Sequence, residues 1–304
     1  MTVAPFAWAQ NFPSKPVRLV TSPPGGSSDF AARVIAPGLS SGLNQQVLVD
    51  NRGGGVLPVE IVAKAPPDGY TLLYYGSTLW LIPLLQETSY DTLRDFIPVS
   101  IAANSPIIVA VHPSLPVKSI KDLVALAKAR PGALNYGSAS AGSPSHLATE
   151  LLKAMARIDM VRISYKGTGP ALTGVISGEV QVFMTSSGGM ASHITAGRIR
   201  ALAVTSVKRS ASFPNLPTVA ESGLPGYEYG QMSGVFAPAK TAPAIIDQLN
   251  KKIVLVVHRA DVREKLFNVG TEAEGTTSQE AIARIKSEVA RLGKVIKEAN
   301  IREN

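Results

Sequence analysis

Two loops rich in glycine and serine contain the residues best suited to hold a small anion. The first reads Ser22-Pro-Pro-Gly-Gly-Ser-Ser-Asp29 and the second reads Gly137-Ser-Ala-Ser-Ala-Gly-Ser-Pro-Ser-His146. Each joins an apolar strand pattern to a helix pattern, so each would aim backbone N–H groups and the positive end of a helix dipole at open space. Gly and Ser also make tight turns that bind nothing, but two matching loops favour the anion site.

Serine residues are expected to begin the helices that follow these loops. Ser27 or Ser28 is suited to cap the first helix, and Ser143 is suited to cap the second, with Pro144 at its first position. In a parallel sheet such loops lie at the carboxyl edge of the strands, where α/β proteins bind ligands.

The elements around these loops alternate between strands and helices, which predicts an α/β architecture with a largely parallel sheet. The expected helices end with a C-terminal one whose apolar stripe docks on a core. The expected strands cover 17–21, 47–49, 70–75, 96–103, 107–111, 135–136, 160–164, 180–185, 199–205 and 235–237. The first helix is expected to pack with Phe30, Val34, Ile35 and Leu39 on one face and to end at Gly42.

Composition limits the classes of protein to which the chain can belong. Of 304 residues, 45% are apolar and 17% are charged, against about 25% charged in an average domain, which argues against disorder. No apolar run approaches the roughly 20 residues of a membrane helix. The 30 basic and 22 acidic residues give a net charge of +8, but the bases are scattered, which disfavours nucleic-acid binding and suits the steering of small anions.

The absence of cysteine excludes disulfides, thiolate metal sites and iron–sulfur clusters. The four histidines lie far apart without metal-ligand spacing, so no metal site is expected. No Gly-x-Gly-x-x-Gly follows a strand, and we expect no cofactor. The motifs of serine hydrolases, Gly-x-Ser-x-Gly and Ser-x-x-Lys, are missing as well, so we expect no catalytic residues and no enzyme activity.

The N-terminus resembles the end of a secretory signal. Residues 3–10 read Val-Ala-Pro-Phe-Ala-Trp-Ala-Gln, with Ala7-x-Ala9 as a cleavage site and Gln10 as the first mature residue. We therefore assign residues 1–9 to a signal-peptide remnant and expect a periplasmic protein. An ordinary frayed terminus is the alternative.

Short segments along the chain resemble one family of proteins. In order they are Pro16-Val-Arg-Leu-Val20, Pro23-Pro-Gly-Gly-Ser-Ser-Asp29, Val47-Leu-Val-Asp-Asn-Arg52, Pro67-Asp-Gly-Tyr-Thr-Leu-Leu73, Leu134-Asn-Tyr-Gly-Ser138, Ser145-His-Leu147, Tyr165-Lys-Gly167, Arg200-Ala-Leu-Ala-Val-Thr205 and Leu216-Pro-Thr-Val219. From about Phe12 to Ile301 the chain resembles the Bug family, the periplasmic solute-binding proteins of tripartite tricarboxylate transporters. The resemblance implies a type II periplasmic-binding fold, two α/β lobes around a ligand cleft, and no cofactor.

The same resemblance implies where the chain crosses between lobes. Lobe one would comprise residues 10–103 and 234–304, and lobe two residues 104–233. The hinge would lie near Pro106–Val109 and Ser233–Ala237, and binding would close the cleft by hinge bending. A carboxylate would be held by the two loops, partly through backbone amides and ordered water.

From the loops and the resemblance together, we expect residues of both lobes to bind the ligand. They are Ser22, Pro24, Gly25, Gly26, Ser27, Ser28, Asp29, Gly76, Ser77, Trp80, Ser138, Ala139, Ser140, Gly142, Ser143, His146, Tyr165, Lys166, Thr168, Thr185 and Ser186.

Several of these residues have a second interpretation. His146 could donate to a carboxylate or pack in the core, and Lys166 could be a surface charge. Asp29 fits a helix start that favours the dipole better than a catalytic acid. Arg52, outside the set, could brace a loop or pair with an anion.

Departures from the family pattern point to the kind of ligand. Ser22 replaces a bulky aromatic residue, and Trp80 stands where relatives often have a small residue, with Tyr75 upstream. These changes predict a pocket that prefers an aromatic or bulky carboxylate over citrate, with a ring stacked on Trp80. The alternative is that Trp80 fills the core of lobe one. Thr185 and Ser186 replace an Asp or Asn, which lessens repulsion of an anion.

The expected function is capture of a small organic carboxylate, aromatic or dicarboxylate, by a monomer that delivers it to membrane transporter subunits. Two other classes stay open. One is a serine-dependent hydrolase using Ser143 and His146. The other is a periplasmic sensor that hands its ligand signal to another protein.

Overall fold

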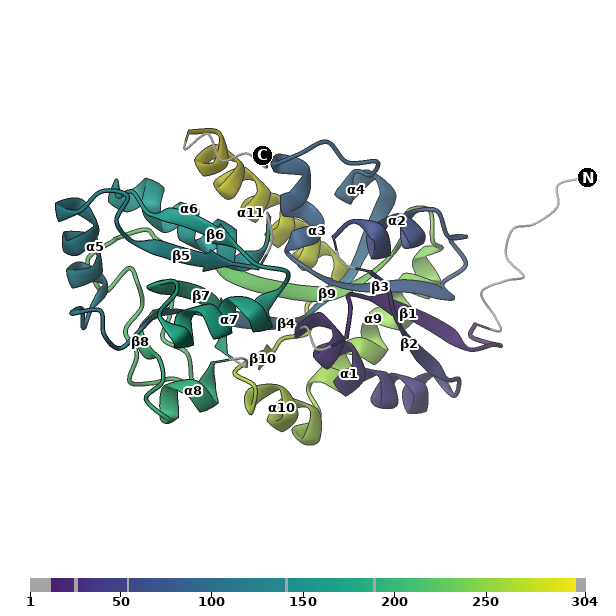
Figure 1. Cartoon of the computed structure of the whole chain (residues 1–304). Coiled ribbons are helices and arrows are strands. Elements are labelled where there is room, and N and C mark those ends of the chain that lie inside the picture. Colours follow the sequence, from purple (N-terminus) through teal and green to yellow (C-terminus); the bar gives the residue numbers. More distant parts are fainter. Residues whose placement is uncertain (1–11, 25–26, 54, 140–141, 188–189, 299–304) are drawn as a thin grey trace, which may run out of the picture.

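The protein is described by a computed structural model covering residues 12–24, 27–53, 55–139, 142–187 and 190–298. Helices and strands alternate along the chain (Figure 1). The elements are β1 (Val17–Thr21), α1 (Ser27–Leu43), β2 (Val47–Asn51), α2 (Leu57–Ala63), β3 (Thr71–Gly76), α3 (Thr78–Leu81), the 3₁₀ helix η2 (Ile82–Leu84), α4 (Thr92–Asp95), β4 (Phe96–Val111), α5 (Ile120–Ala129), β5 (Asn135–Ser138), α6 (Pro144–Ala156), β6 (Val161–Ser164), α7 (Thr168–Ser177), β7 (Val182–Ser186), α8 (Ala191–Thr195), β8 (Arg200–Val204), β9 (Gly230–Pro238), α9 (Pro243–Val257), α10 (Ala260–Phe267), β10 (Glu272–Ala273) and α11 (Ser278–Glu298). The predicted α/β architecture is confirmed.

One strand connects two groups of strands. The N-terminal part of β4 pairs with β9 and β10, and its C-terminal part pairs with β7 and β8. The strand order is β2-β1-β3-β9-β4-β7-β5-β6. The expectation of a largely parallel sheet is only partly correct: β1 pairs in parallel with β2 and β3, and β5 with β6 and β7, whereas β4 and β9 pair antiparallel.

Helices cover both faces of each group. Alternation along β3 shows this directly, because Leu72 and Tyr74 enter the core beneath α1 and α9, while Leu73 and Tyr75 enter the core that contains residues of α2, α3 and α11. In the second group, α5 and α6 pack on one face and α7 on the other. Since side chains of a strand point alternately to opposite faces, β3 contributes to two cores.

Several predicted boundaries are wrong; the strand expected at 235–237, for example, spans Gly230–Pro238 as β9. The strands expected at 96–103 and 107–111 form the single strand β4, which pairs with β9 from Phe96 to Pro106 and with β7 from Ile107 to Val111. Helix α1 continues through Gly42 to Leu43, and Asn44 beyond it has a φ of 52°. Asparagine tolerates the left-handed conformation through which helices commonly end, so it ends this helix instead of the glycine.

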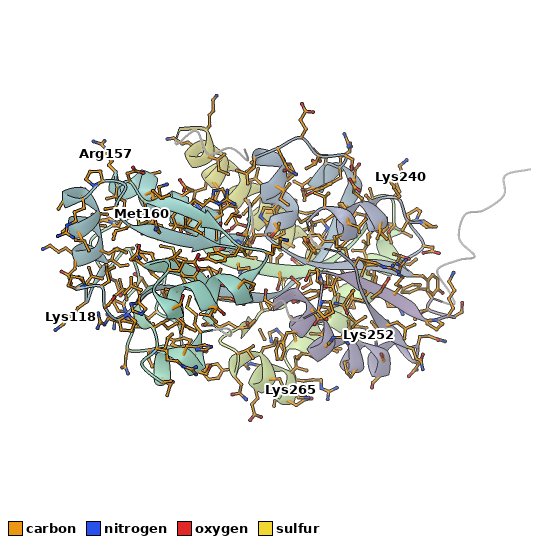
Figure 2. All side chains as sticks on the ribbon, in the orientation of Figure 1. Lys118, Arg157, Met160, Lys240, Lys252 and Lys265 are labelled. Atoms are coloured by element: carbon orange, nitrogen blue, oxygen red, sulfur yellow. The ribbon has the colours of Figure 1, made fainter. Side chains whose placement is uncertain are left out.

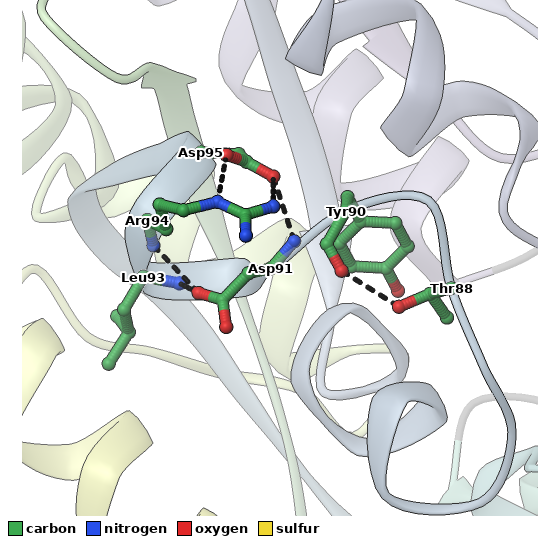
Figure 3. Close-up of polar contacts among 6 residues, drawn as sticks. All are labelled: Thr88, Tyr90, Asp91, Leu93, Arg94 and Asp95. Atoms are coloured by element: carbon green, nitrogen blue, oxygen red, sulfur yellow. Dashed lines mark hydrogen bonds and ion pairs between the residues drawn. The ribbon is translucent and has the colours of Figure 1, made fainter.

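The segment before β4 is held by local polar contacts (Figure 3). Asp91 caps α4 by accepting hydrogen bonds from the backbone N–H groups of Leu93 and Arg94 at 3.1 and 2.8 Å. Buried Thr92 donates its hydroxyl to the carbonyl of Leu79 at 3.0 Å, which ties this segment to α3. The end of the connection that precedes β4 is therefore tied back to α3.

Basic side chains are spread around the molecule. Lys118 and Arg157 lie at one end and Lys240 at the other, and Lys265 lies on the lower side (Figure 2). All four are exposed. This distribution lacks the single basic face of a nucleic-acid binder. In the described residues, every helix is too short or too polar to cross a bilayer.

Candidate ligand-binding site

The first loop leads from the end of β1 into α1. Helix α1 begins at Ser27, so Ser27 and Ser28 lie within its first turn instead of preceding it as a cap. Ser27 and Pro24 are exposed, Ser22 is partly exposed and Ser28 is buried. Gly25, Gly26 and Ser140, which we expected to contact the ligand, lie outside the described residues.

A hydrogen-bond network joins the two flanks of this loop. The Nδ2 atom of Asn51 donates to the carbonyl oxygen of Ser22 at 2.7 Å and to Oδ1 of Asp29 at 2.8 Å. Arg33 donates through Nε to Oδ1 of Asp29 at 2.8 Å and through Nη2 to Oδ1 of Asn51 at 2.6 Å. Asp29 is only 6% exposed. It therefore acts as a structural acid at the helix start, as its second interpretation suggested.

Strand β9 also reaches this loop. Gln231 donates its side-chain amide to Oγ of Ser27 at 3.0 Å, and Ser77 donates its hydroxyl to the carbonyl of Met232 at 3.3 Å. A Cβ placed on Gly76 would lie 3.6 Å from Nε2 of Gln231 and 3.8 Å from Oγ of Ser28. The structure thus brings Ser27, Ser28, Gly76 and Ser77 together at the carboxyl ends of β1 and β3.

The second loop forms a compact polar cluster at the start of α6. Ser143 caps the helix by accepting from the backbone N–H of His146, and its hydroxyl lies 2.9 Å from the hydroxyl of Ser145. The N–H of Ala139 donates to Oγ of Ser145 at 3.0 Å. The predicted cap is confirmed, and Pro144 occupies the first helical position, where its missing N–H costs nothing.

His146 is a buried, neutral side chain. It is 4% exposed, and its Nδ1 accepts the backbone N–H of Gly142 at 3.1 Å. Burial, with the positive charge of Arg162 as a smaller cause, lowers the pKa of His146 to about 4. The hydrogen bond from Gly142 assigns the remaining proton to Nε2. His146 therefore bends the loop back onto the helix and adds no charge near neutral pH.

The second loop also touches elements that pack beneath β3. A Cβ placed on Gly142 would lie 3.2 Å from Cδ1 of Leu85 and 3.4 Å from Cγ1 of Ile82. Ser138 is fully buried and accepts a hydrogen bond from Nε of Arg162 at 2.8 Å. Both loops are thus braced by side chains from other elements.

The remaining candidate ligand-binding residues of the second strand group differ in how far they are exposed. Tyr165 turns its ring toward α7, where its hydroxyl oxygen lies 2.3 Å from the position of a Cβ on Gly174. Lys166 and Thr168 are exposed. At the end of β7, Thr185 is buried and Ser186 is partly exposed, paired with Ile108 and Ile107 of β4.

The placement of Trp80 corrects one expectation. The indole is 1% exposed, its Nε1 donates to Oε2 of Glu288 at 2.7 Å, and its ring packs 6.0 Å from that of Phe236. Tyr75 is buried as well and donates its hydroxyl to the carbonyl of Gly55 at 2.6 Å. These rings fill the core, where a buried indole needs a partner for its N–H. Neither ring forms the exposed apolar wall expected for an aromatic ligand.

Sequence reasoning missed three residues of these clusters. Asn51 is the last residue of β2, a strand parallel to β1, so the rule that ligands gather at carboxyl ends of strands could have found it. Gln231 and Glu288 make contacts with residues about 200 positions away along the chain, for which no local pattern exists.

Chemically, the two clusters offer neutral donors at helix starts. The N-terminal turn of α6 contains no acidic residue, and the acid in the first turn of α1 is paired with Arg33. Among the described residues, no group of three or more His, Asp or Glu side chains is arranged to hold a metal ion. This arrangement suits an anion that is bound through backbone N–H groups and hydroxyls.

Similar proteins share nearly the whole chain. The profile of the tripartite tricarboxylate transporter family receptor matches residues 31–301. A UPF0065 protein encoded in the tcbD-tcbE intergenic region of Pseudomonas sp. strain P51 is 37% identical, over 96% of this chain and 89% of its own length. Protein BugT of Bordetella pertussis is 35% identical, over 95% of this chain and 91% of its own length.

Solved structures give the same result for the fold. Rpa4515 of R. palustris, solved with adipate, has a TM-score of 0.88 at 36% identity and covers 96% of this chain and 99% of its own. The periplasmic binding protein BugD has a TM-score of 0.85 at 29% identity, with 96% and 100% covered. MatC of Rhodopseudomonas palustris, with bound malate, has a TM-score of 0.83 at 27% identity, with 94% and 100% covered. The predicted periplasmic-binding fold is confirmed, and the chain belongs to the tripartite tricarboxylate transporter receptor family.

Proposed function

We propose that the protein captures a small organic carboxylate in the cleft between two lobes and delivers it to the membrane subunits of a tripartite tricarboxylate-type transporter. The observation that carries the proposal is the pair of strand–loop–helix units, β1 to α1 and β5 to α6, which each present a helix start at the carboxyl end of a parallel strand. Helix N-termini favour anions because their first N–H groups are unpaired and their dipoles are positive there.

The chemistry of relatives supports the same class of ligand. Rpa4515 was solved with adipate and MatC with malate, which are both aliphatic dicarboxylates. Since the Trp80 ring is buried in the core, it offers no surface on which an aromatic ligand could stack. We therefore propose an aliphatic carboxylate, with dicarboxylates first.

We also propose that residues 10–103 and 234–304 form one lobe and that residues 104–233 form the other. Strand β4 continues from one group of strands to the other, and β9 pairs with it from Pro106 opposite Gly230 to Phe96 opposite Pro238. Bending of these two strands near 106–109 and 233–237 would open and close the cleft. Such a change presents a different outer surface to membrane subunits when the ligand is bound.

We further propose that the protein works as a monomer in the periplasm, after loss of a signal peptide whose remnant is residues 1–9. The family supports this location, because BugD is described as a periplasmic binding protein. Cross-linking in intact cells separates uptake from sensing: adducts with the transporter subunits support uptake, and adducts with a signalling protein alone contradict it.

The contacts of Ser143 and His146 favour binding over hydrolysis. Nδ1 of His146 is occupied by the N–H of Gly142, and the Ser143 hydroxyl serves as helix cap and neighbour of Ser145. A serine nucleophile needs a base within hydrogen-bond reach of its hydroxyl, and the described contacts give this pair other partners. Turnover of generic esters or amides that disappears in Ser143→Ala would contradict the binding proposal.

A thermal-shift screen tests the proposal. Adipate, malate, citrate and benzoate are added to the purified protein, and unfolding is followed with each. A ligand present at a hundred times its dissociation constant stabilises a protein by about 2.7 kcal/mol. We expect the dicarboxylates to raise the melting temperature and to be recovered unchanged. Stabilisation by none of the acids, or conversion of the added acid, contradicts the proposal.

A further inference from the structure

The sheet places the side chain of Asn51 beside the first loop. Strands β1 and β2 are parallel neighbours in which Thr21 lies opposite Asn51, and each is the last residue of its strand. The pairing continues for one further hydrogen bond, from the N–H of Arg52 to the carbonyl of Thr21 at 3.0 Å. Asn51 is thus held at the point where the chain leaves β1 for the loop.

The Asn51 amide bonds to both flanks of the loop at once. Its Nδ2 donates to the carbonyl of Ser22, at the start of the loop, and to the carboxylate of Asp29, in the first turn of α1, at 2.7 and 2.8 Å. Its Oδ1 accepts from Nη2 of Arg33 at 2.6 Å. With both N–H groups and the oxygen in use, the amide has one favoured orientation.

The same network compensates the charge of Asp29. This carboxylate is 6% exposed and lies in the turn that would face a bound anion. Arg33 and Asn51 both donate to its Oδ1, at 2.8 Å each. Hydrogen bonds to an ionised group are roughly twice as strong as those between neutral groups. An anion at the helix start therefore meets an acid that is already paired.

We infer that Asn51 is a positioning residue for ligand binding: its amide fixes the start of α1 relative to the end of β1, the two elements that the first loop connects. The expected effect of Asn51 on ligand affinity rests on the proposed function. The hydrogen bonds of Asn51 themselves are present in the chain without ligand. Asn51 acts through Ser22 and Asp29.

The chain contains a matched control in Asn250. On α9, its Nδ2 also donates twice, to the carbonyls of Val99 and Thr276 at 2.7 and 2.8 Å. Asn51→Asp and Asn250→Asp each remove two N–H donors without a change of size, and each sets a carboxylate against oxygen acceptors. Both variants should lose stability, but only the first disturbs the loop.

Hydrogen exchange and calorimetry on the full chain test the inference together. In Asn51→Asp we expect amides of the second turn of α1, which bond to carbonyls of the first turn, to exchange at least tenfold faster than in the wild type. In Asn250→Asp these amides should keep the wild-type rate. With whichever of adipate, malate, citrate or benzoate binds the wild type most tightly, we expect a dissociation constant at least tenfold higher for Asn51→Asp, and within twofold of the wild type for Asn250→Asp.

Two outcomes overturn the inference: unchanged exchange at the start of α1 in Asn51→Asp, or an equal loss of affinity in both variants, which would reflect general destabilisation. If none of the four acids binds the wild type, the proposed function fails. The exchange comparison still decides whether Asn51 holds the loop.

Discussion

Glu288 is a buried acid in the middle of the apolar stripe of α11. It is 5% exposed and accepts a hydrogen bond from the indole N–H of Trp80. The charge of Arg291 lowers its pKa and the charge of Glu228 raises it, each less than burial does. Burial raises the pKa of Glu288 from 4.5 to about 7. The folded state thus holds this proton more tightly than the unfolded chain, so stability falls as pH rises from about 4.5 through 7.

Replacing Glu288 by glutamine should remove this loss of folding stability at higher pH. The glutamine amide keeps an oxygen for the Trp80 N–H and carries no charge, so we expect Glu288→Gln to gain stability relative to the wild type, from little at pH 4.5 to on the order of 3 kcal/mol at pH 8. Urea unfolding at both pH values measures it. His146, with its pKa lowered to about 4, adds the opposite slope in acid, so the difference between the two proteins is the informative quantity. An identical pH slope in both contradicts the assignment.

At the level of single residues, sequence reasoning succeeded where the signal was local. Ser143 was identified as a cap because its partner N–H lies three positions away. Trp80 was assigned to the pocket, and the glutamate that occupies its N–H, 208 positions further along, was not foreseen. Asn51 was part of a noted motif without a role, because its role depends on which strand lies beside β2.

The helix caps of α5 and α6 provide a comparison between elements. Ser119 accepts from the N–H of Asp122, and Ser143 accepts from the N–H of His146. Loss of a serine cap costs about 1 kcal/mol. We expect Ser119→Ala and Ser143→Ala to lose similar stability in chemical unfolding, while only Ser143→Ala lowers the affinity for the acid. Equal affinity in the two variants contradicts a role of the second loop in binding.

Gly142 tests the contact of the second loop with η2 and with the residue that follows η2. Its φ is 69°, and an added Cβ would meet Leu85 and Ile82 at 3.2 and 3.4 Å. Gly197 has a φ of 67° with no atom within 4 Å of such a Cβ. The left-handed conformation alone costs alanine roughly 1–2 kcal/mol. We expect Gly142→Ala to lose more stability and more affinity than Gly197→Ala. Equal losses would show that the contact is unimportant.

Periodicity was sufficient to predict most helices and strands, because it reflects which face of each element is buried. It could not predict that β4 is one strand, nor that it pairs antiparallel with β9, since that pairing joins residues 96–106 to 230–238. Antiparallel pairs at the centre arise from these long-range crossings. Local sequence patterns contain no information about them.

At the scale of the whole molecule, β4 is shared by two groups of strands, and β9 lies beside it. In the proposed function these two strands bend, and a bound carboxylate, and not merely a ligand of suitable shape, brings the two groups together. Each loop contributes neutral donors, so an esterified ligand of nearly the same shape should lose the interaction.

Calorimetric titration with the acid selected by the screen and with its methyl ester tests this claim most directly. We expect one acid bound per chain, an ester that binds at least a hundredfold more weakly, and both compounds recovered unchanged. Equal binding of acid and ester, or hydrolysis of the ester by the protein, would contradict it.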